Sequence, residues 1–284
     1  MIQQSHLTAW QAYAPWDKRS KIEQDLRLSR AVAAIFSDDV LSEHLALRGG
    51  TVLHKGHLAP AARYSEDLDL VLIKPLDKST LDARLRSVLA PVLGDPSDSV
   101  IADAWLAVRN AWRPSKLLRT IYRYVPLGLR YPMVVKVEVN LNEQSSLFPF
   151  IEVQVALLDE DGELTRCAAR SYDINEMLGR KLRALMQRRQ GRDLFDLYHA
   201  ANFGPRATPA CPIDGAQVIE AFTWYLKNDD TQMTREDAES RLADHLADRE
   251  FRTDMRQLLR YDFGPCNADT AAELVRTTYL AHLP

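Results

Sequence analysis

One short stretch, from Leu47 to Ile73, limits more than any other what this chain can fold into. It contains the turn-forming residues Gly49-Gly50-Thr51 and ends in an aliphatic run that starts with Asp67 and Asp69. The alternation of polar and apolar residues predicts a strand, and residues two apart in a strand point to the same side. Two carboxylates so close repel each other unless a cation lies between them. The stretch therefore predicts a strand that presents a pair of acids able to bind a metal.

The glycines suit a second ligand. Gly49 and Gly50 precede Val52-Leu53-His54-Lys55, which can open a helix. A glycine-rich turn at the start of a helix presents free backbone N–H groups, which bind phosphate. Each feature also has an ordinary interpretation, as a simple turn or as a solvated strand end. Both features in this order within one short unit indicate nucleotidyl or phosphoryl transfer.

The composition is that of a globular protein. Of the 284 residues, 46% are hydrophobic and 26% are charged, which is enough to bury a sizeable core. The formal net charge of -3 gives no overall positive field, so any polyanion must be bound by a local patch. Cys167, Cys211 and Cys266 lack metal-ligand spacing and are expected to be reduced thiols of a cytoplasmic protein. The sequence shows no signal-peptide pattern and no apolar run of transmembrane length, so we expect no membrane partner.

The hydrophobic pattern predicts an α+β protein. Strands are expected over residues 45–48, 67–73, 117–125, 133–140 and 151–158, whereas residues 100–112 fit a helix or a strand. Helices are expected over residues 18–36, 39–44, 78–90 (ended by Pro91), 218–226, 235–247, 251–258 and 270–280, and also directly after Asp173 and Gly191. The change to a helical pattern predicts a core domain of residues 1–168 and a helical lobe of residues 169–284.

Glu138 is an acid within an apolar strand. In the strand of residues 133–140 it shares its side with Lys136, opposite to a row of valines. It is either a third carboxylate beside Asp67 and Asp69 or a solvent-facing residue of a half-exposed sheet.

Lys181 lies on the apolar stripe of a helix, in which Asp173 is expected as the N-cap and Glu176 as the partner in a capping box. A lysine is almost never buried without a partner, so its ammonium either reaches solvent or meets an anion, and we favour the anion. Asp193 and Asp196 are three apart and therefore lie on one side of the next helix. Their ordinary interpretation is that acidic residues favour the first turn of a helix, where they interact with its dipole. The same region carries the densest positive patch, which either forms a solvated face or binds phosphate: Arg180, Lys181, Arg183, Arg188, Arg189 and Arg192.

These motifs, in this order, resemble those of the AbiEii/AbiGii nucleotidyltransferase-like toxins, which include the mycobacterial MenT toxins. The resemblance spans residues 47–200 and is carried by Arg48-Gly-Gly-Thr51-x-Leu53-x-Lys55, Arg63-Tyr-Ser-Glu-Asp-Leu-Asp69, Glu138 in a later strand, Lys181-Leu-Arg-Ala-Leu and Arg192-Asp-Leu-Phe-Asp196. The family implies a two-lobed α+β fold, in which a polymerase-beta-like nucleotidyltransferase core with a mixed sheet is followed by a helical lobe. Its members are the toxins of two-gene toxin–antitoxin or phage-abortive systems.

The resemblance implies a role for each motif. Phosphate would be bound by Arg48, Gly49, Gly50, Thr51, Ser65 and Lys181, and Mg²⁺ by Asp67, Asp69 and Glu138. The catalytic set would be Asp67, Asp69, Glu138 and Lys181, with Asp193 or Asp196 as the acid of the helical lobe. Thr51 stands where many relatives of the wider fold carry serine, and it keeps the hydroxyl group.

The resemblance also implies a reaction and its partners. NMP would pass from an NTP, with a pyrimidine nucleotide expected, to the 3′ end of tRNA, which blocks translation in the cytoplasm, and a cognate antitoxin would neutralise the protein. Two alternatives stay open. The same phosphate-binding residues serve NMP or phosphoryl transfer to a protein target, and a non-catalytic protein could keep the site for nucleotide binding or for interaction.

Overall fold

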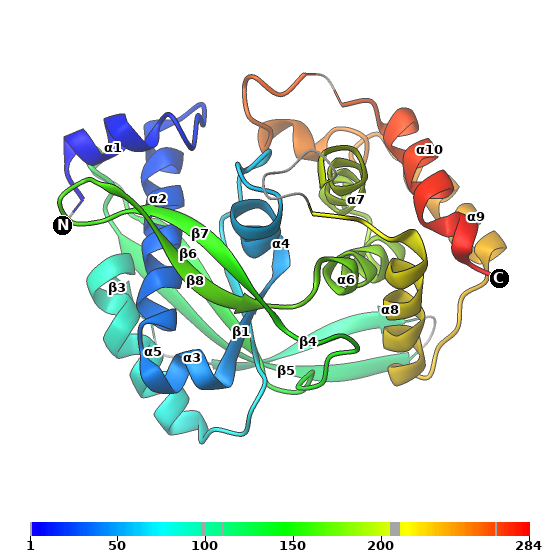
Figure 1. The fold of residues 1–284 in the computed structure, drawn as a ribbon, viewed down its shortest axis with the longest axis horizontal. Helices are drawn as coiled ribbons and strands as arrows, with labels where there is room; N and C mark the ends of the chain where they lie inside the picture. Colours follow the sequence, from blue (N-terminus) through cyan, green and yellow to red (C-terminus); the bar gives the residue numbers. More distant parts are fainter. Residues whose placement is uncertain (1, 98–99, 109–110, 205–210, 265) are drawn as a thin grey trace. The chain divides into compact units, whose positions relative to one another are not determined.

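The computed structural model describes residues 2–97, 100–108, 111–204, 211–264 and 266–284 (Figure 1). It divides the chain into two compact units. Unit 1 comprises Met1–Ala104, Ser115–Ser146 and Phe150–Tyr172, and unit 2 comprises Trp105–Pro114, Leu147–Pro149 and Asp173–Pro284. The expected domain division after residue 168 stays a prediction, because compactness does not show which segment folds by itself.

Eight strands of the described residues form one mixed sheet, in the order β3-β5-β6-β2-β1-β8-β7, with β4 paired to β5. β2 runs antiparallel to β1 and parallel to β6. The strands are β1 (Leu45–Arg48), β2 (Leu68–Leu72), β3 (Asp95–Pro96), β4 (Val100–Val108), β5 (Ala111–Tyr124), β6 (Met133–Asn140), β7 (Ile151–Leu158) and β8 (Leu164–Ser171). The five predicted strands are present, and the predicted α+β class is confirmed.

Two parts of the sheet go beyond the prediction. Of the segment that fitted a helix or a strand, residues 100–108 form β4 and residues 111–112 begin β5, whereas residues 109 and 110 lie outside the described part of the chain. β8 is not predicted, because its first residues, Leu164-Thr165-Arg166, are all exposed and show no alternation. Its position comes from pairing with β7 through the turn at Asp159–Gly162, where Gly162 has a φ of 88° that suits glycine.

Six helical segments lie in the described part of unit 1: α1 (Gln4–Trp10), α2 (Arg19–Phe36), α3 (Asp39–His44), α4 (Gly49–Val52), the π-helix η1 (Leu53–His57) and α5 (Lys78–Leu93). α2 packs against β7, β8 and α5 (Figure 1). The prediction that Pro91 ends its helix is wrong, because α5 continues to Leu93. In the last turn of a helix a proline removes only one hydrogen bond, which the helix tolerates.

Unit 2 is mainly helical. Its elements are α6 (Ile174–Gln187), α7 (Gly191–Phe203), α8 (Gly215–Asn228), α9 (Arg235–Leu246), the 3₁₀ turn η3 (Asp254–Gln257), α10 (Ala268–Thr278) and the 3₁₀ turn η4 (Leu280–His282). α6 packs closely against α8, because a Cβ atom on Gly179 would come within 2.8 Å of the Val218 carbonyl oxygen. The helix predicted over residues 251–258 is reduced to η3. No described helix is both long and apolar enough to cross a bilayer, and the three cysteines are free thiols.

Glu176 corrects one local prediction. Asp173 caps α6 by accepting a hydrogen bond from the Asn175 N–H, as expected, but Glu176 does not complete a capping box. Its carboxylate accepts hydrogen bonds from the backbone N–H groups of Leu147 and Phe148 and from the Tyr225 hydroxyl group. Glu176 therefore fixes the Leu147–Pro149 segment within unit 2.

Candidate active site

The glycine turn of unit 1 is shaped by Asp69 on the neighbouring strand β2. β1 ends at Arg48 and leads directly into α4, and Gly49 has a φ of 79°, which favours glycine. A Cβ atom on Gly49 would overlap the carboxylate of Asp69. Position 49 therefore requires glycine for its backbone and also for the space that Asp69 occupies.

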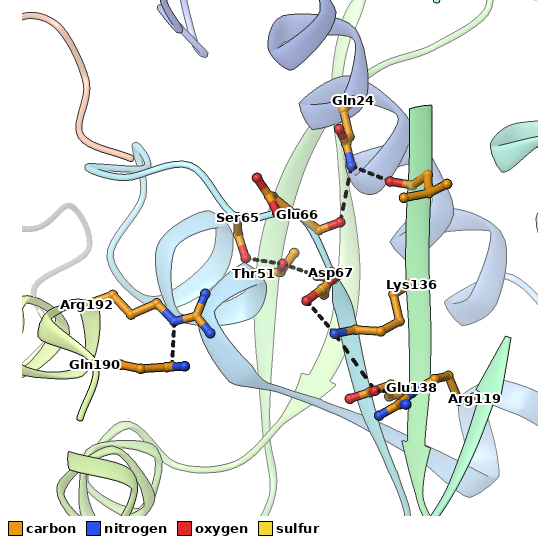
Figure 2. A network of polar contacts seen from close by, with 11 residues as sticks. Gln24, Thr51, Ser65, Glu66, Asp67, Arg119, Lys136, Glu138, Gln190 and Arg192 are labelled. Atoms are coloured by element: carbon orange, nitrogen blue, oxygen red, sulfur yellow. Dashed lines mark hydrogen bonds and ion pairs between the residues drawn. The ribbon is translucent and has the colours of Figure 1, made fainter. Parts of the chain in front are cut away.

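The hydroxyl groups of the motif hold the loop before β2. Thr51 is buried, and its Oγ1 donates a hydrogen bond to the carbonyl oxygen of Asp67 and lies 2.8 Å from Ser65 Oγ (Figure 2). These contacts fix where Asp67 leaves the loop and enters the sheet. Direct contacts of Thr51 and Ser65 with phosphate stay predictions.

The strand register gathers charged residues on one part of the sheet. Asp69 is paired with Arg48 on β1 and with Glu138 on β6. Glu138 is in turn paired with Arg119 on β5. Across the neighbouring strands β1, β2, β6 and β5, the paired positions thus carry a base, two acids and a base in succession. Leu68 and Leu70, which flank Asp69 along β2, are buried. The parallel pairing of β2 with β6 is what brings the candidate third acid beside the Asp-x-Asp motif.

Two basic side chains bind these acids (Figure 2). Lys136 Nζ lies 3.0 Å from Asp67 Oδ2 and 3.9 Å from Glu138 Oε1. Arg119 Nε donates a hydrogen bond of 2.6 Å to Glu138 Oε1. Burial alone would lower the pKa of Lys136, but the hydrogen bond to Asp67 and the charges of Asp67, Glu138 and Asp69 together raise it. The ammonium is therefore held in its charged form by the acids around it.

Gln24 on α2 ties the loop before β2 to β6. Its Nε2 donates hydrogen bonds to the carbonyl oxygens of Glu66, at 3.3 Å, and Val134, at 3.0 Å (Figure 2). Its Oε1 accepts a hydrogen bond of 2.7 Å from the Tyr64 hydroxyl group. These bonds hold the backbone next to Asp67 in place.

The carboxylates of Asp67, directly before β2, and of Asp69, within it, fit a hard cation. Carboxylate oxygens are the ligands that Mg²⁺ prefers in proteins, and the ammonium bound to Asp67 shows that this position accepts a positive charge. Among the residues that the structure describes, no three acids, histidines or cysteines are grouped closely enough to hold a metal. Glu138, the predicted third ligand, is bound to Arg119, so a metal at its carboxylate would have to compete with that contact.

Unit 2 contains a second cluster of charges. Lys181 Nζ lies 2.8 Å from Asp196 Oδ2 and 3.2 Å from Asp193 Oδ1, and all three residues are buried. Arg188 donates two further hydrogen bonds to Asp193, of 2.7 and 3.0 Å. Burial would raise the pKa of Asp193, but the charge of Lys181 and the hydrogen bond and charge of Arg188 outweigh it, so the pKa is lowered. Lys181 is thus paired with two carboxylates on α7, and its expected contact with the phosphates of a nucleotide stays a prediction.

Comparison with known families assigns the chain to one of them. Residues 30–270, which are most of the chain, match the family model described as the nucleotidyl transferase AbiEii toxin of type IV toxin–antitoxin systems. The chain belongs to the AbiEii family. This AbiEii protein is accordingly a nucleotidyltransferase toxin of a toxin–antitoxin system, which confirms the family resemblance and the enzyme class inferred from the motifs.

Solved structures agree with the fold. MenT4, a nucleotidyltransferase toxin from Mycobacterium tuberculosis H37Rv, is 16% identical with a TM-score of 0.60, and the match covers 100% of this AbiEii protein and 91% of MenT4. JHP933 from Helicobacter pylori is 19% identical with a TM-score of 0.51, and the match covers 93% of each chain. At these identities the likeness shows the fold alone. No curated protein is detectably similar in sequence.

Sequence reasoning missed three residues of this candidate site. Arg119 and Gln24 carry no sequence signal, because each acts through a partner that lies far away along the chain. Lys136 did have a signal, since it shares a strand side with Glu138, but its pairing with Asp67 depends on the register of β6 against β2.

Proposed function

We propose that this AbiEii protein transfers NMP from a pyrimidine NTP to the 3′ end of tRNA in a Mg²⁺-dependent reaction. The observation that carries the proposal is the fit between the glycine turn and the strand acids, in which Gly49 leaves room for the carboxylate of Asp69. The turn that we propose to bind phosphate and one of the acids that we propose to bind metal thereby lie side by side within one unit. The tRNA acceptor and the preference for a pyrimidine nucleotide rest on the family resemblance.

In this proposal Asp67 and Asp69 would hold the divalent metal, which when bound neutralises charge on the α-phosphate and on the leaving pyrophosphate. Glu138 is proposed as a further ligand or as the base that receives the acceptor proton. The acceptor hydroxyl oxygen attacks the α-phosphorus in line. The bond from the α-phosphorus to the bridging oxygen breaks, pyrophosphate leaves, and the hydroxyl proton passes to the base.

The phosphates require positive groups. Within unit 1 we assign this role to the backbone N–H groups at Gly50 and Thr51 and to Arg48, and for Lys181 of unit 2 the family resemblance alone implies it. Arg48 is half-buried and already bound to Glu143, with Nη1 and Oε2 3.1 Å apart. Lys181 is held by carboxylates on α7, so this part of the proposal gives Asp193 and Asp196 the role of orienting its ammonium.

The proposal includes a cellular setting. A cognate antitoxin would neutralise the protein, as the toxin–antitoxin family implies. The reaction would take place in the cytoplasm, where NTP and tRNA are found.

A labelled-nucleotide assay tests the reaction. The protein is incubated with each of the four α-labelled NTPs, with total tRNA or total protein as the acceptor, in the presence or absence of Mg²⁺. We expect one pyrimidine NTP to label tRNA only when Mg²⁺ is present. Label in the protein pool would favour transfer to a protein target, and no label in either pool would favour a non-catalytic protein.

Matched variants make the assay specific to the acids. Asp69→Asn should abolish transfer while the far-UV circular dichroism spectrum is unchanged. Asp161→Asn makes the same change of charge in the exposed β7–β8 turn and should transfer label at the normal rate. An Asp69→Asn protein with normal activity would contradict the metal assignment.

A further inference from the structure

The acids of unit 1 already have a cation between them. Lys136 Nζ lies 3.0 Å from Asp67 Oδ2 and 3.9 Å from Glu138 Oε1, so one ammonium bridges the acid directly before β2 and an acid of β6 (Figure 2). The lysine belongs to β6, two residues before Glu138, and its side chain is half-buried. A metal bound by Asp67 would need the position that this ammonium approaches.

Lys136, bound to Asp67, and Arg119, bound to Glu138, differ in how firmly their side chains are held. Arg119 is opposite Glu138 on β5 and forms a hydrogen bond to it through a planar, rigid group. Lys136 carries a single charge on a flexible four-carbon stem, which can turn away without breaking the sheet. Its ammonium is therefore the cation that can leave when another cation arrives.

We propose that Lys136 is a built-in counter-ion, which occupies the cation position beside Asp67 until a divalent metal displaces its ammonium. The inference rests on the proposed function, which assigns Asp67 and Asp69 to the metal. It adds that metal binding is a competition with part of the chain. Lys136 therefore stabilises the metal-free acids and weakens the binding of free metal.

Direct binding of Mn²⁺ measures this competition. Free Mn²⁺ is followed by electron paramagnetic resonance during titration of the wild type, Lys136→Met and Lys136→Gln. Both variants should bind Mn²⁺ about tenfold more tightly, as expected when one half-exposed unit charge close to the ion is removed. Lys74→Met is the control, because Lys74 follows β2 but is exposed and paired with Glu43, with Nζ and Oε1 2.9 Å apart. Its affinity for Mn²⁺ should equal that of the wild type.

Thermal unfolding gives a second readout that does not depend on activity. Without metal, the Lys136 variants should melt at a lower temperature than Lys74→Met, because their acids repel each other. Mn²⁺ should raise the melting temperature of the Lys136 variants more than that of the wild type. A variant that is unfolded without metal and folds when Mn²⁺ is added supports the inference. One that stays unfolded in Mn²⁺ overturns it, since the lysine would then serve a structural role that metal cannot replace.

The failure of this inference and the failure of the proposed function can be told apart. If Asp69→Asn binds Mn²⁺ as well as the wild type does, the metal assignment fails, and the inference about Lys136 fails with it. If Mn²⁺ binding depends on Asp69 but has the same affinity in Lys136→Met and the wild type, only the inference about Lys136 is overturned.

Discussion

The substitution Gly49→Ala changes two properties of the glycine turn at once. The backbone φ of 79° at this position is one that alanine adopts at a cost of about 1–2 kcal/mol. The new methyl group would also overlap the carboxylate of Asp69, so that either the strand or the turn has to move. Overpacking of this kind costs a further amount of about 1–3 kcal/mol. We therefore expect the free energy of unfolding to fall by about 2–5 kcal/mol.

The chain contains a matched control for the backbone part. Gly128, in the turn between β5 and β6, has a φ of 83°, and a Cβ atom there would have nothing within 4 Å. Gly128→Ala should therefore lower the free energy of unfolding only by the backbone cost, about 1–2 kcal/mol. Urea denaturation of both variants measures the difference between them, which is the cost of the contact with Asp69.

Function should separate the two variants more sharply than stability does. Displacing a metal-binding carboxylate by even about 1 Å can slow a reaction by about a hundredfold. Nucleotide transfer by Gly49→Ala should fall by about this factor under conditions in which the variant is folded, whereas Gly128→Ala should retain its activity. Equal losses of stability in the two variants, with transfer retained in Gly49→Ala, would refute the claim that the turn and Asp69 are fitted to each other.

Two further predictions concern buried titratable groups. Lys181→Met leaves two buried carboxylates without their shared ammonium and should reduce the free energy of unfolding by about 3–5 kcal/mol. Adding Asp196→Asn should recover part of this loss in urea denaturation, and a fully additive double variant would contradict the pairing. Burial lowers the pKa of His57 to about 4, so below the unfolded pKa of about 6.5 only the unfolded chain takes up this proton. Stability should therefore fall from about pH 7 to about pH 4, by up to about 3 kcal/mol from this group. His57→Gln should flatten the pH dependence measured by urea denaturation, and an unchanged slope would contradict it.

The Asp-x-Asp strand could be predicted because its evidence is local. Asp67 and Asp69 are two residues apart, and the expected strand 67–73 is found as β2 from Leu68 to Leu72, so that Asp69 lies within it and Asp67 directly before it. The glycine turn is equally local, since a positive φ favours glycine whatever surrounds it. Such features depend on the backbone within a few residues, which the sequence describes completely.

The remaining contacts of the site depend on which strands become neighbours. Lys136 meets Asp67, and Arg119 meets Glu138, only because β6 lies between β2 and β5 in one particular register. A shift by one residue would turn the whole set to the other side of the sheet. Because nothing local fixes the pairing of distant strands, sequence reasoning could list Glu138 as a candidate but could not name its partners.

The capping-box prediction failed for a related reason. Asp173 and Glu176 have the right spacing, and Asp173 caps the helix as the local rule requires. The rule assumes that the nearest backbone N–H is the best partner for the second acid. In unit 2 the N–H groups of Leu147 and Phe148 and the hydroxyl group of Tyr225 provide three hydrogen bonds to Glu176. A buried carboxylate gains more from three donors than from one, so the tertiary contact replaces the local one.

The motif acids are balanced by bases of the same unit before any ligand arrives. Asp67 is bound to Lys136 in unit 1, and Asp193 is bound to Lys181 and Arg188 in unit 2. A sequence motif suggests acids that have no partner until a metal binds. Unpaired acids so close together would repel each other and destabilise the metal-free protein. A metal or a nucleotide therefore gains only the difference between its own interactions and those that it replaces. It follows that removing a base can strengthen the binding of metal while it weakens the fold, an opposition that a list of site residues read from the sequence does not reveal.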